Sequence, residues 1–574
     1  MGDGNDAFGS TAIEWESEPV PTLGRYDGYE RAREGFEWTL PETFNVATDV
    51  VTRHAADRTG VALAQRIEDG DERTHTFRDF ERESNRLANA LEARGLERGD
   101  RVAIVGSRSD RLLLAHLATW KVGAISVPLS VLYGSDALAV RLGDCEPRVV
   151  FADLDRSETL AAALAGVERV EYVVGMDGEP EPIDGVETVA LADLEGGLEY
   201  DAVETAADDA AFLLYTSGTT GRPKGVLHAH RTLLGWLPGF QLCFELPWHE
   251  SEPLLYVTPD LAWIGGLNLV LGSWHYGFPA FCHDSASGFD PAAVFENVDR
   301  YGLTHAVLVP GMLKAMADLD ASQYDLSSLE VVLSGSEPVS ARLHDYVTEN
   351  LDATLNEMYG QTEALHLVTS CSQWLDAAPG SLGYPVPGHD VRVLRDDGTE
   401  CAVGEVGTIA VGMPDPAVFT ELWNDEEATE RRFIDDGEWL DTGDLGYADA
   451  DGQLWFTSRA DDLILTNGYR VGPTEIEASI RELESVAEVG VVGLADERRG
   501  ELIAACVQPS EGVTADQRLA ETIAVHVSER LAAHQYPRRV AFVEELPTTV
   551  TGKLKRRALE DVADGLDWFY VPRT

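Results

Sequence analysis

The chain has 574 residues, and a single hydrophobic core stops growing near about 250 to 300 residues, so we expect at least two domains. Its 44% apolar and 25% charged residues are typical of a globular protein, and no apolar run approaches the ~20 residues of a membrane-spanning helix. A net charge of −56 disfavours binding to nucleic acid or to anionic membranes. The acidic N-terminus lacks the basic start and apolar stretch of a secretory signal, which predicts a cytoplasmic protein.

The acidic residues are spread along the whole chain, with 100 Asp and Glu against 44 Lys and Arg. A dispersed excess of carboxylates favours a halophilic adaptation, in which salt screens the self-repulsion, over a tail for one partner. Lysine is scarce, so each lysine is a candidate for a task that needs a compact ammonium. The lysines are Lys121, Lys224, Lys314, Lys553 and Lys555. The six cysteines have no metal-ligand spacing, and we expect buried, reduced thiols.

The first part of the chain alternates helical and strand patterns. Helical spacing over 77–95 ends at a glycine, and a second helix is expected over 112–124. Short apolar runs predict strands at 101–106, 124–130, 148–154, 211–217, 254–259, 305–310, 329–335 and 391–398. The acidic segment 150–210 is otherwise expected to be irregular surface structure. The alternation predicts an α/β fold with largely parallel strands and with ligand-binding loops at the strand ends.

A smaller α+β unit is predicted after residue 460. Strand patterns are found at 462–468, 486–494, 502–508 and 539–546, with amphipathic helical patterns at 473–486 and 516–533. Together they form a unit of ordinary domain size.

A loop rich in glycine and hydroxyl residues follows the predicted strand 211–217, with the sequence Tyr215-Thr-Ser-Gly-Thr-Thr-Gly-Arg-Pro-Lys-Gly225. Backbone N–H groups and hydroxyls in such a loop can cradle phosphate oxygens, and Lys224 adds positive charge. The loop lacks the spacing G-x-x-x-x-G-K-[ST], so it is not the phosphate loop of P-loop NTPases.

This loop resembles the phosphate-binding signature of the adenylate-forming superfamily, which includes acyl-CoA synthetases, luciferases and adenylation domains of peptide synthetases. Further signatures of that superfamily follow in its order: NEMYGQTE at 356–363, DTGD at 441–444, SRADD at 458–462 with NGYRVG at 467–472, and PTTVTGK at 547–553. The resemblance covers residues 40–565. It implies a large N-terminal α/β domain of several subdomains, 1–460, and a small mobile α+β domain, 461–574.

The resemblance implies that ATP and Mg²⁺ bind through these signatures. Glu363 offers a hard carboxylate suited to Mg²⁺, Tyr359 a ring on which adenine can stack, and Asp444 a carboxylate for both ribose hydroxyls. Arg459 would donate to the ribose and Arg470 to the α-phosphate or CoA. The predicted nucleotide-binding residues are Thr216, Ser217, Gly218, Thr219, Thr220, Gly221, Lys224, Gly335, Ser336, Glu337, Glu357, Met358, Tyr359, Gly360, Gln361, Thr362, Glu363, Asp444, Arg459, Arg470 and Lys553, of which Thr216, Glu363 and Lys553 are assigned catalytic roles.

Lys553 is the residue that the resemblance assigns to adenylation. When a carboxylate attacks the α-phosphorus, negative charge builds on the non-bridging oxygens, and an ammonium aimed at them stabilises the transition state more than the ground state. A surface lysine would be the ordinary alternative, but this chain hardly uses lysine on its surface.

The second half-reaction needs a path for the CoA thiol, and the resemblance makes Asp461 the hinge about which the small domain rotates. The residues implied in CoA binding are Asn467, Gly468, Tyr469, Arg499, Tyr536 and Arg538. The implied acyl-pocket residues are Trp263, Ile264, Gly265 and Gly360. Acetate-specific relatives carry a Trp at the position of Gly360, so we expect room beyond acetate.

The sequence therefore predicts an AMP-forming acyl-CoA synthetase that acts on medium-chain or similar-sized acids through an acyl-adenylate. Transfer of the acyl group to a carrier-protein thiol is the alternative. The partners are then a small carboxylic acid, ATP and CoA, and a homo-oligomer is compatible with the sequence.

Overall fold

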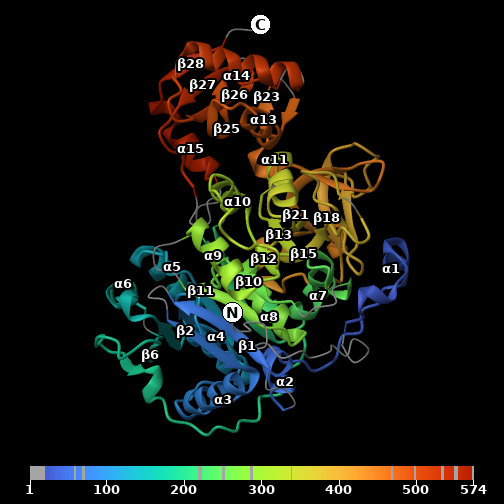
Figure 1. Cartoon of the computed structure of the whole chain (residues 1–574). Helices are drawn as coiled ribbons and strands as arrows, with labels where there is room; N and C mark the ends of the chain where they lie inside the picture. Colours follow the sequence, from blue (N-terminus) through green and yellow to red (C-terminus); the bar gives the residue numbers. More distant parts are fainter. Residues whose placement is uncertain are drawn as a thin grey trace. The chain divides into compact units, whose positions relative to one another are not determined.

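The computed structural model describes residues 20–56, 60–67, 71–167, 169–217, 223–248, 253–284, 289–337, 339–375, 377–466, 469–496, 499–531, 535–548 and 554–571 (Figure 1). The chain divides into two compact units. The first comprises 1–391 with 411–440, and the second comprises 392–410 with 441–574. The sequence predicted a domain boundary at 460/461 from the position of the hinge, and this boundary remains a prediction.

The first unit contains an eight-stranded sheet in the order β19-β9-β8-β4-β3-β5-β6-β7. Its strands are β3 (Arg101–Val105), β4 (Ile125–Leu129), β5 (Val149–Ala152), β6 (Tyr172–Gly175), β7 (Glu187–Ala190), β8 (Ala210–Ser217), β9 (Pro223–Ala229) and β19 (Glu421–Leu422). The strands from β8 to β7 are parallel, whereas β9 pairs antiparallel with β8 and β19. The predicted parallel α/β arrangement is thus confirmed for this sheet.

A second sheet of the first unit has nine strands in the order β16-β15-β14-β13-β12-β10-β11-β1-β2. The strands are β1 (Val61–Ile67), β2 (Glu72–Thr76), β10 (Leu255–Val257), β11 (Ala280–Asp284), β12 (His305–Val307), β13 (Val331–Gly335), β14 (Thr354–Gln361), β15 (Ala364–Thr369) and β16 (Tyr384–Pro385). The run from β1 to β14 is parallel, and antiparallel strands close both edges.

Helices surround these sheets: α1 (Tyr29–Gly35), α2 (Arg53–Ala55), α3 (Phe77–Ala93), α4 (Asp110–Lys121), α5 (Ser135–Cys145), α6 (Ser157–Leu164), α7 (Thr232–Cys243), α8 (Ile264–His275), α9 (Pro291–Tyr301), α10 (Pro310–Ala317), α11 (Ala341–Asp345) and α12 (Glu426–Glu430). The start of α3 is fixed by a capping box between Thr76 and Asp79, and its apolar face is buried. The helices α7 and α8 are buried along almost their whole lengths, which explains their continuous apolar sequences.

Lys121, the last residue of α4, is fully buried. Its ammonium contacts Glu81 Oε2 at 2.7 Å and Asn85 Oδ1 at 2.5 Å, and both of these partners lie on α3. Burial lowers the pKa of Lys121, and the charge of Glu81 opposes that shift. This lysine therefore has a structural role, joining two helices.

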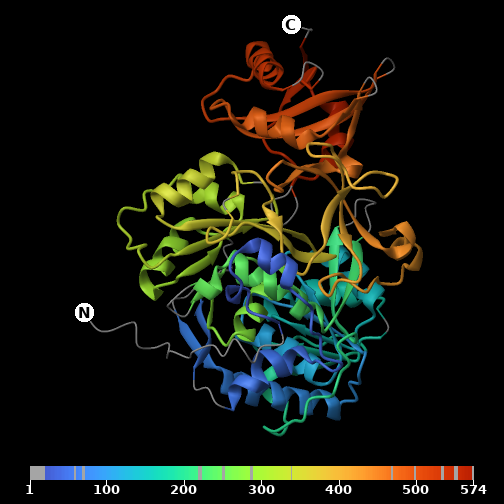
Figure 2. The same ribbon diagram turned by 90° about the vertical axis from the view of Figure 1, so that its right-hand side faces the viewer.

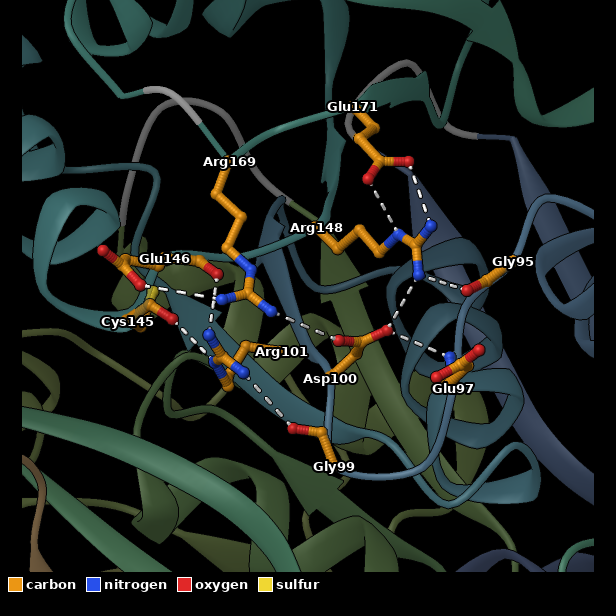
Figure 3. A network of polar contacts seen from close by, with 10 residues as sticks. All are labelled: Gly95, Glu97, Gly99, Asp100, Arg101, Cys145, Glu146, Arg148, Arg169 and Glu171. Atoms are coloured by element: carbon orange, nitrogen blue, oxygen red, sulfur yellow. Dashed lines mark hydrogen bonds and ion pairs between the residues drawn. The ribbon is translucent and has the colours of Figure 1, made fainter.

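Arginine carries most of the positive charge at the surface of the first sheet. Figure 3 shows Arg148 reaching Asp100, at 3.3 Å, and Glu171, at 3.2 Å, from the segment that enters β5. Arg169 lies 3.9 Å from both Asp100 and Glu146. These pairs are exposed or half-exposed, so each contributes at most about 1 kcal/mol.

The expectation that 150–210 is irregular was wrong in part, because β6 and β7 of this segment extend the eight-stranded sheet. Each has only four residues, so neither carries a hydrophobic pattern long enough to distinguish it from a loop. Five of the six cysteines are buried, as predicted, but Cys401 is partly exposed. Among the described helices, none is both long and apolar enough to cross a membrane.

The chain passes between the two units within a five-stranded sheet, ordered β17-β18-β21-β20 with β22 paired to β21. Its strands are β17 (Val391–Leu394), β18 (Gly407–Gly412), β20 (Phe433–Ile434), β21 (Trp439–Ala448) and β22 (Leu454–Arg459).

The second unit has its own six-stranded sheet, in which β24-β23-β26-β27-β28 are consecutive and β25 pairs with β26. The strands are β23 (Ile464–Thr466), β24 (Tyr469–Val471), β25 (Val486–Asp496), β26 (Gly500–Pro509), β27 (Arg539–Phe542) and β28 (Trp568–Tyr570), with helices α13 (Pro473–Arg481), α14 (Gln517–Arg530) and α15 (Arg556–Val562) (Figure 2). Apolar residues of α13, α14, β25 and β26 share one core, which confirms the predicted α+β unit.

Candidate active site

The glycine- and hydroxyl-rich signature begins at the end of β8 and continues into β9. These strands are antiparallel, with Thr216 opposite Lys224 and Ser217 opposite Pro223. The structure therefore brings Thr216 beside Lys224, both of which were predicted from the sequence. Four predicted residues of the intervening segment, Gly218, Thr219, Thr220 and Gly221, lie outside the described residues, as does the side chain of Ser217.

The loop 334–337 lies beside the NEMYGQTE signature because β13 and β14 are parallel neighbours. Gly335 stands opposite Met358, and a Cβ atom at Gly335 would come within 2.6 Å of the Met358 carbonyl oxygen. Ser336 has a φ of 74°, the left-handed region that ordinary residues rarely adopt, and Glu337 is exposed. The close approach of the two segments explains the glycine, and the unusual backbone at a strand end is typical of a functional loop.

Glu363 ends the NEMYGQTE signature between β14 and β15. Its carboxylate lies 3.7 Å from Arg432, which also donates to Gln361 Oε1 at 3.4 Å. The preceding carbonyl of Thr362 accepts a hydrogen bond of 2.7 Å from His228 Nε2 on β9. Arg432 and His228 were missed in the sequence analysis, because no local spacing connects them to a segment so far along the chain.

Tyr359 and Gly360 occupy the end of β14. The Tyr359 side chain is only 9% exposed, so an adenine can reach one face or edge of the ring at most. A Cβ atom at Gly360 would lie 2.9 Å from Leu365 Cα and from the backbone nitrogen of His366. Backbone crowding is therefore sufficient to require glycine here, and the inference of acyl-pocket size from this residue remains a prediction.

Glu357 is largely buried between β14 and the chain that follows β13. Burial raises the pKa of its carboxyl to about 7, although backbone N–H groups of Val339 and Gly380 partly oppose that shift. The Val339 N–H donates to Glu357 Oε2 at 3.1 Å. This carboxyl therefore titrates near neutral pH inside the predicted nucleotide-binding set.

We expect Glu357→Gln to flatten the pH dependence of stability between about pH 4.5 and 7. A carboxyl with a folded pKa above its unfolded value stabilises the native state below the unfolded pKa, and that stabilisation is lost as pH rises through the folded pKa. The loss in the wild type is about 3 kcal/mol, and the amide variant lacks it. Chemical unfolding at pH 5 and pH 8 measures the difference. Glu337→Gln, at an exposed position, is the control, and parallel profiles for Glu357→Gln and the wild type would contradict the assignment.

The DTGD and SRADD signatures pair within the β21–β22 hairpin. Asp444 stands opposite Arg459, and Arg459 Nη1 donates to Asp444 Oδ1 at 2.9 Å. Asp444 is buried, and its backbone N–H donates to Thr442 Oγ1. Asp461 lies next to this pair, with its carboxylate 3.6 Å from Arg459 Nε. The structure thus brings together three residues that the sequence predicted separately.

Lys553 lies outside the described residues, but both flanks of its segment are fixed within the second unit. Thr548 and Leu554 form an isolated antiparallel bridge, and the Lys555 N–H donates to the Pro547 carbonyl at 2.8 Å.

The helix α15 that follows is anchored by an arginine that the sequence analysis missed. Arg556 contacts the buried Glu477 carboxylate at 2.6 and 2.7 Å and lies 3.8 Å from Asp462. Burial raises the pKa of Glu477, and the Arg556 charge opposes that shift. One side chain therefore connects α15 both to α13 and to the segment beside the predicted hinge.

The predicted CoA-binding residues are dispersed over the second unit. Tyr469 is exposed on β24, and Arg499 is half-buried near the start of β26. Tyr536 belongs to the core of the unit, and its hydroxyl accepts a 2.7 Å hydrogen bond from Arg538. Asn467, Gly468 and the Arg470 side chain lie outside the described residues.

The predicted acyl-pocket residues lie at the start of α8. Trp263 precedes the helix, and its ring packs edge-on against Tyr133 at a centroid distance of 6.1 Å. Ile264 is buried. A Cβ atom at Gly265 would meet nothing within 4 Å, so open space adjoins this part of the helix.

The comparisons with known proteins identify the class of protein. Residues 51–423 match the model of the AMP-binding enzyme family, and residues 475–553 match that of the AMP-binding enzyme C-terminal domain. The chain therefore belongs to the AMP-binding enzyme family, among its acyl-CoA synthetases and ligases. The fold and the ligase class predicted from the sequence are confirmed.

Three relatives define this similarity. An acetyl-coenzyme A synthetase of Bacillus subtilis is 31% identical over 93% of this chain and 94% of its own length. The mitochondrial acyl-coenzyme A synthetase ACSM3 of Mus musculus is 28% identical over 94% of each protein. Among solved structures, the anthranilate CoA ligase AuaEII in complex with anthranoyl-AMP has a TM-score of 0.80 and 28% identity, covering 91% of this chain and 98% of the other.

Proposed function

We propose that the chain joins a carboxylic acid to CoA, using ATP to form an acyl-adenylate and releasing AMP and diphosphate. The observation that carries this proposal is the juxtaposition of β13 and β14. It puts the loop 334–337 directly beside the NEMYGQTE signature, which ends in Glu363. A carboxylate and a strained loop at the carboxyl ends of parallel strands are typical of a ligand-binding edge.

The phosphates of ATP are assigned to the first unit. Thr216 and Lys224, paired across β8 and β9, would donate a hydroxyl and an ammonium to phosphate oxygens. Glu363 fits Mg²⁺, because it is a hard, partly exposed carboxylate whose described ion pair, to Arg432, is as long as 3.7 Å. Glu363 would hold Mg²⁺, and the chemistry that the ion would supply there is neutralisation of the phosphate charge.

The nucleoside is assigned as follows. Asp444 would accept both ribose hydroxyls, with Arg459 holding its carboxylate in place. Tyr359, with Ser336 and Glu337 of the neighbouring loop, would flank the adenine. Lys553 would neutralise charge at the α-phosphorus, and rotation about Asp461 would then admit CoA past Tyr469 and toward Arg499 and Arg538.

Acids larger than acetate are the proposed substrates, because open space adjoins Gly265 on the wall of the assigned pocket. A methylene is worth only about 1 to 3 kcal/mol of discrimination, so several chain lengths would be accepted. A cytoplasmic location remains a prediction from the N-terminal sequence, and adaptation to salt remains a prediction from the composition.

A screen of diphosphate release tests the proposal. Acids from acetate to long-chain and aromatic acids are incubated with ATP, Mg²⁺ and CoA at high salt, and the acyl-CoA thioester is identified by mass. We expect acid-dependent release coupled to thioester formation. Adenylate formation without a CoA thioester would favour transfer to a carrier protein, and no diphosphate release with any acid would overturn the assignment.

A further inference from the structure

Two polar side chains meet in the apolar core of the first unit, next to the assigned acyl pocket. Asn268 lies on α8 one helical turn after Ile264, and His366 lies on β15. Asn268 Nδ2 is 2.6 Å from His366 Nε2, and both side chains are essentially inaccessible to solvent. Their sequence neighbours Leu267, Leu269 and Leu365 belong to the main hydrophobic core.

This pair leaves hydrogen-bonding capacity unused. Among the described residues, neither Asn268 Oδ1 nor His366 Nδ1 has a hydrogen-bond partner. Burial lowers the pKa of His366 to about 3, so its ring is neutral and carries a single N–H. The Asn268 amide nitrogen can only donate, so His366 Nε2 accepts in this contact, and the pair is left with an unused donor, the His366 Nδ1–H, and an unused acceptor, Asn268 Oδ1.

Such an arrangement is costly for a purely structural pair. An unsatisfied polar group in an apolar interior costs roughly 1 to 3 kcal/mol. His366 also has a φ of 59°, in the left-handed region that residues other than glycine uncommonly adopt. Helix α7 packs closely against it, because a Cβ atom at Gly239 would come within 2.6 Å of His366 Cβ. The strain and the unused hydrogen bonds together point to a ligand.

The pair lies close to residues that are assigned to the acyl pocket. His366 adjoins Gly360, whose added Cβ would lie 2.9 Å from the His366 backbone nitrogen. Asn268 shares α8 with Ile264 and Gly265, the other residues assigned to the pocket. The buried His389 is near enough to lower the pKa of His366 through its charge. His389 is hydrogen-bonded to Asp415 at 2.6 Å, and its Nε2 has no partner among the described residues.

We propose that Asn268 and His366 bind a hydroxyl group on the acyl part of the substrate, so that the preferred acids are hydroxy acids. A hydroxyl donates one hydrogen bond and accepts another, which satisfies both open positions, whereas an alkyl chain satisfies neither. This proposal rests on the proposed function. A site built to bind a hydroxyl discriminates strongly against the analogue that lacks it, because its own buried polar groups then remain unpaired.

The test compares matched acids. Benzoate with its three hydroxy isomers, and hexanoate with its hydroxy isomers, are assayed for kcat/KM by diphosphate release. For the best isomer of the wild type we expect kcat/KM at least about 100-fold above that of the unsubstituted parent. Asn268→Leu, which keeps the branched shape and the number of side-chain heavy atoms, should bring that ratio close to one, chiefly by lowering kcat/KM for the hydroxy acid.

Two further variants keep the test decisive. His366→Asn retains a polar group and a residue that tolerates left-handed backbone, and an intermediate ratio is expected. Asn297→Leu is the matched control, because it removes a buried amide that is bonded to Tyr256 in a separate hydrophobic core of the first unit. In this variant the ratio of kcat/KM for the hydroxy acid to kcat/KM for the parent acid should equal that of the wild type.

Each outcome decides the proposal. Equal kcat/KM for hydroxy and parent acids in the wild type, or an unchanged ratio in Asn268→Leu, would overturn it and indicate that the pair holds a buried water. In that case the enzyme would still form CoA thioesters from the parent acids, so the proposed function would stand. An absence of diphosphate release with every acid would instead count against the proposed function itself.

Discussion

Replacing Lys553 by alanine is expected to slow acyl-adenylate formation by about 1000-fold. Removing one group that stabilises developing charge typically costs 10²- to 10³-fold in rate, and an ammonium at the α-phosphorus carries a full charge. Thioester formation from pre-made acyl-adenylate and CoA should keep most of its rate, because no phosphate charge develops in that step. Single-turnover measurements of the two half-reactions separate these effects.

Lys555 provides the matched control, since it is an exposed lysine two residues further along the chain. Lys555→Ala should leave both half-reactions close to the wild-type rates. Equal losses in both half-reactions of Lys553→Ala would indicate a structural defect and would remove Lys553 from its assigned role.

Replacing Asp444 by asparagine is expected to raise the KM for ATP by about 10- to 100-fold, the second-largest effect. The carboxylate would accept hydrogen bonds from the ribose, and a charged acceptor is worth about 1.5 to 3 kcal/mol in such a bond. The substitution also removes the ionic partner of Arg459, which lies 2.9 Å away. Initial rates with ATP and with 2′-deoxy-ATP measure the role directly.

The deoxynucleotide distinguishes ribose binding from a general loss of structure. The wild type should lose affinity for 2′-deoxy-ATP, whereas Asp444→Asn should bind the two nucleotides alike because the contact is already missing. Asp449→Asn serves as the control, since Asp449 belongs to the same hairpin but bonds to Trp455. If Asp444→Asn lost as much affinity on going from ATP to 2′-deoxy-ATP as the wild type does, Asp444 would not be the ribose contact.

Much of the fold could be predicted from local patterns. The strands at 101–105 and 211–217 and the helix 77–93 are continuous apolar or amphipathic runs with clear ends, and the structure has them close to their predicted bounds. The four-residue strands β6 and β7 could not be found in the same way. Their pairing depends on neighbours in the sheet, and four residues are too few to show a period.

The candidate site divides in a similar way. Asp444 and Arg459 were each found in a signature, and the hairpin places them opposite each other. Arg432 beside Glu363, and Asn268 beside His366, could not be predicted, because these partners are brought together only by the sheet and helix packing of the first unit. No single-sequence pattern records contacts between segments so distant along the chain.

The burial of Lys121 against Glu81 and Asn85 has a practical consequence for chemical labelling. An amine-directed reagent added to the native protein would find that lysine sequestered, which leaves the α-amino group and four other lysines, and two of these lie in the phosphate and C-terminal signatures. Because so few amines compete for the reagent, protection of these lysines by a bound nucleotide would appear as a large fractional decrease in labelling. The experiment needs no substitution in the protein.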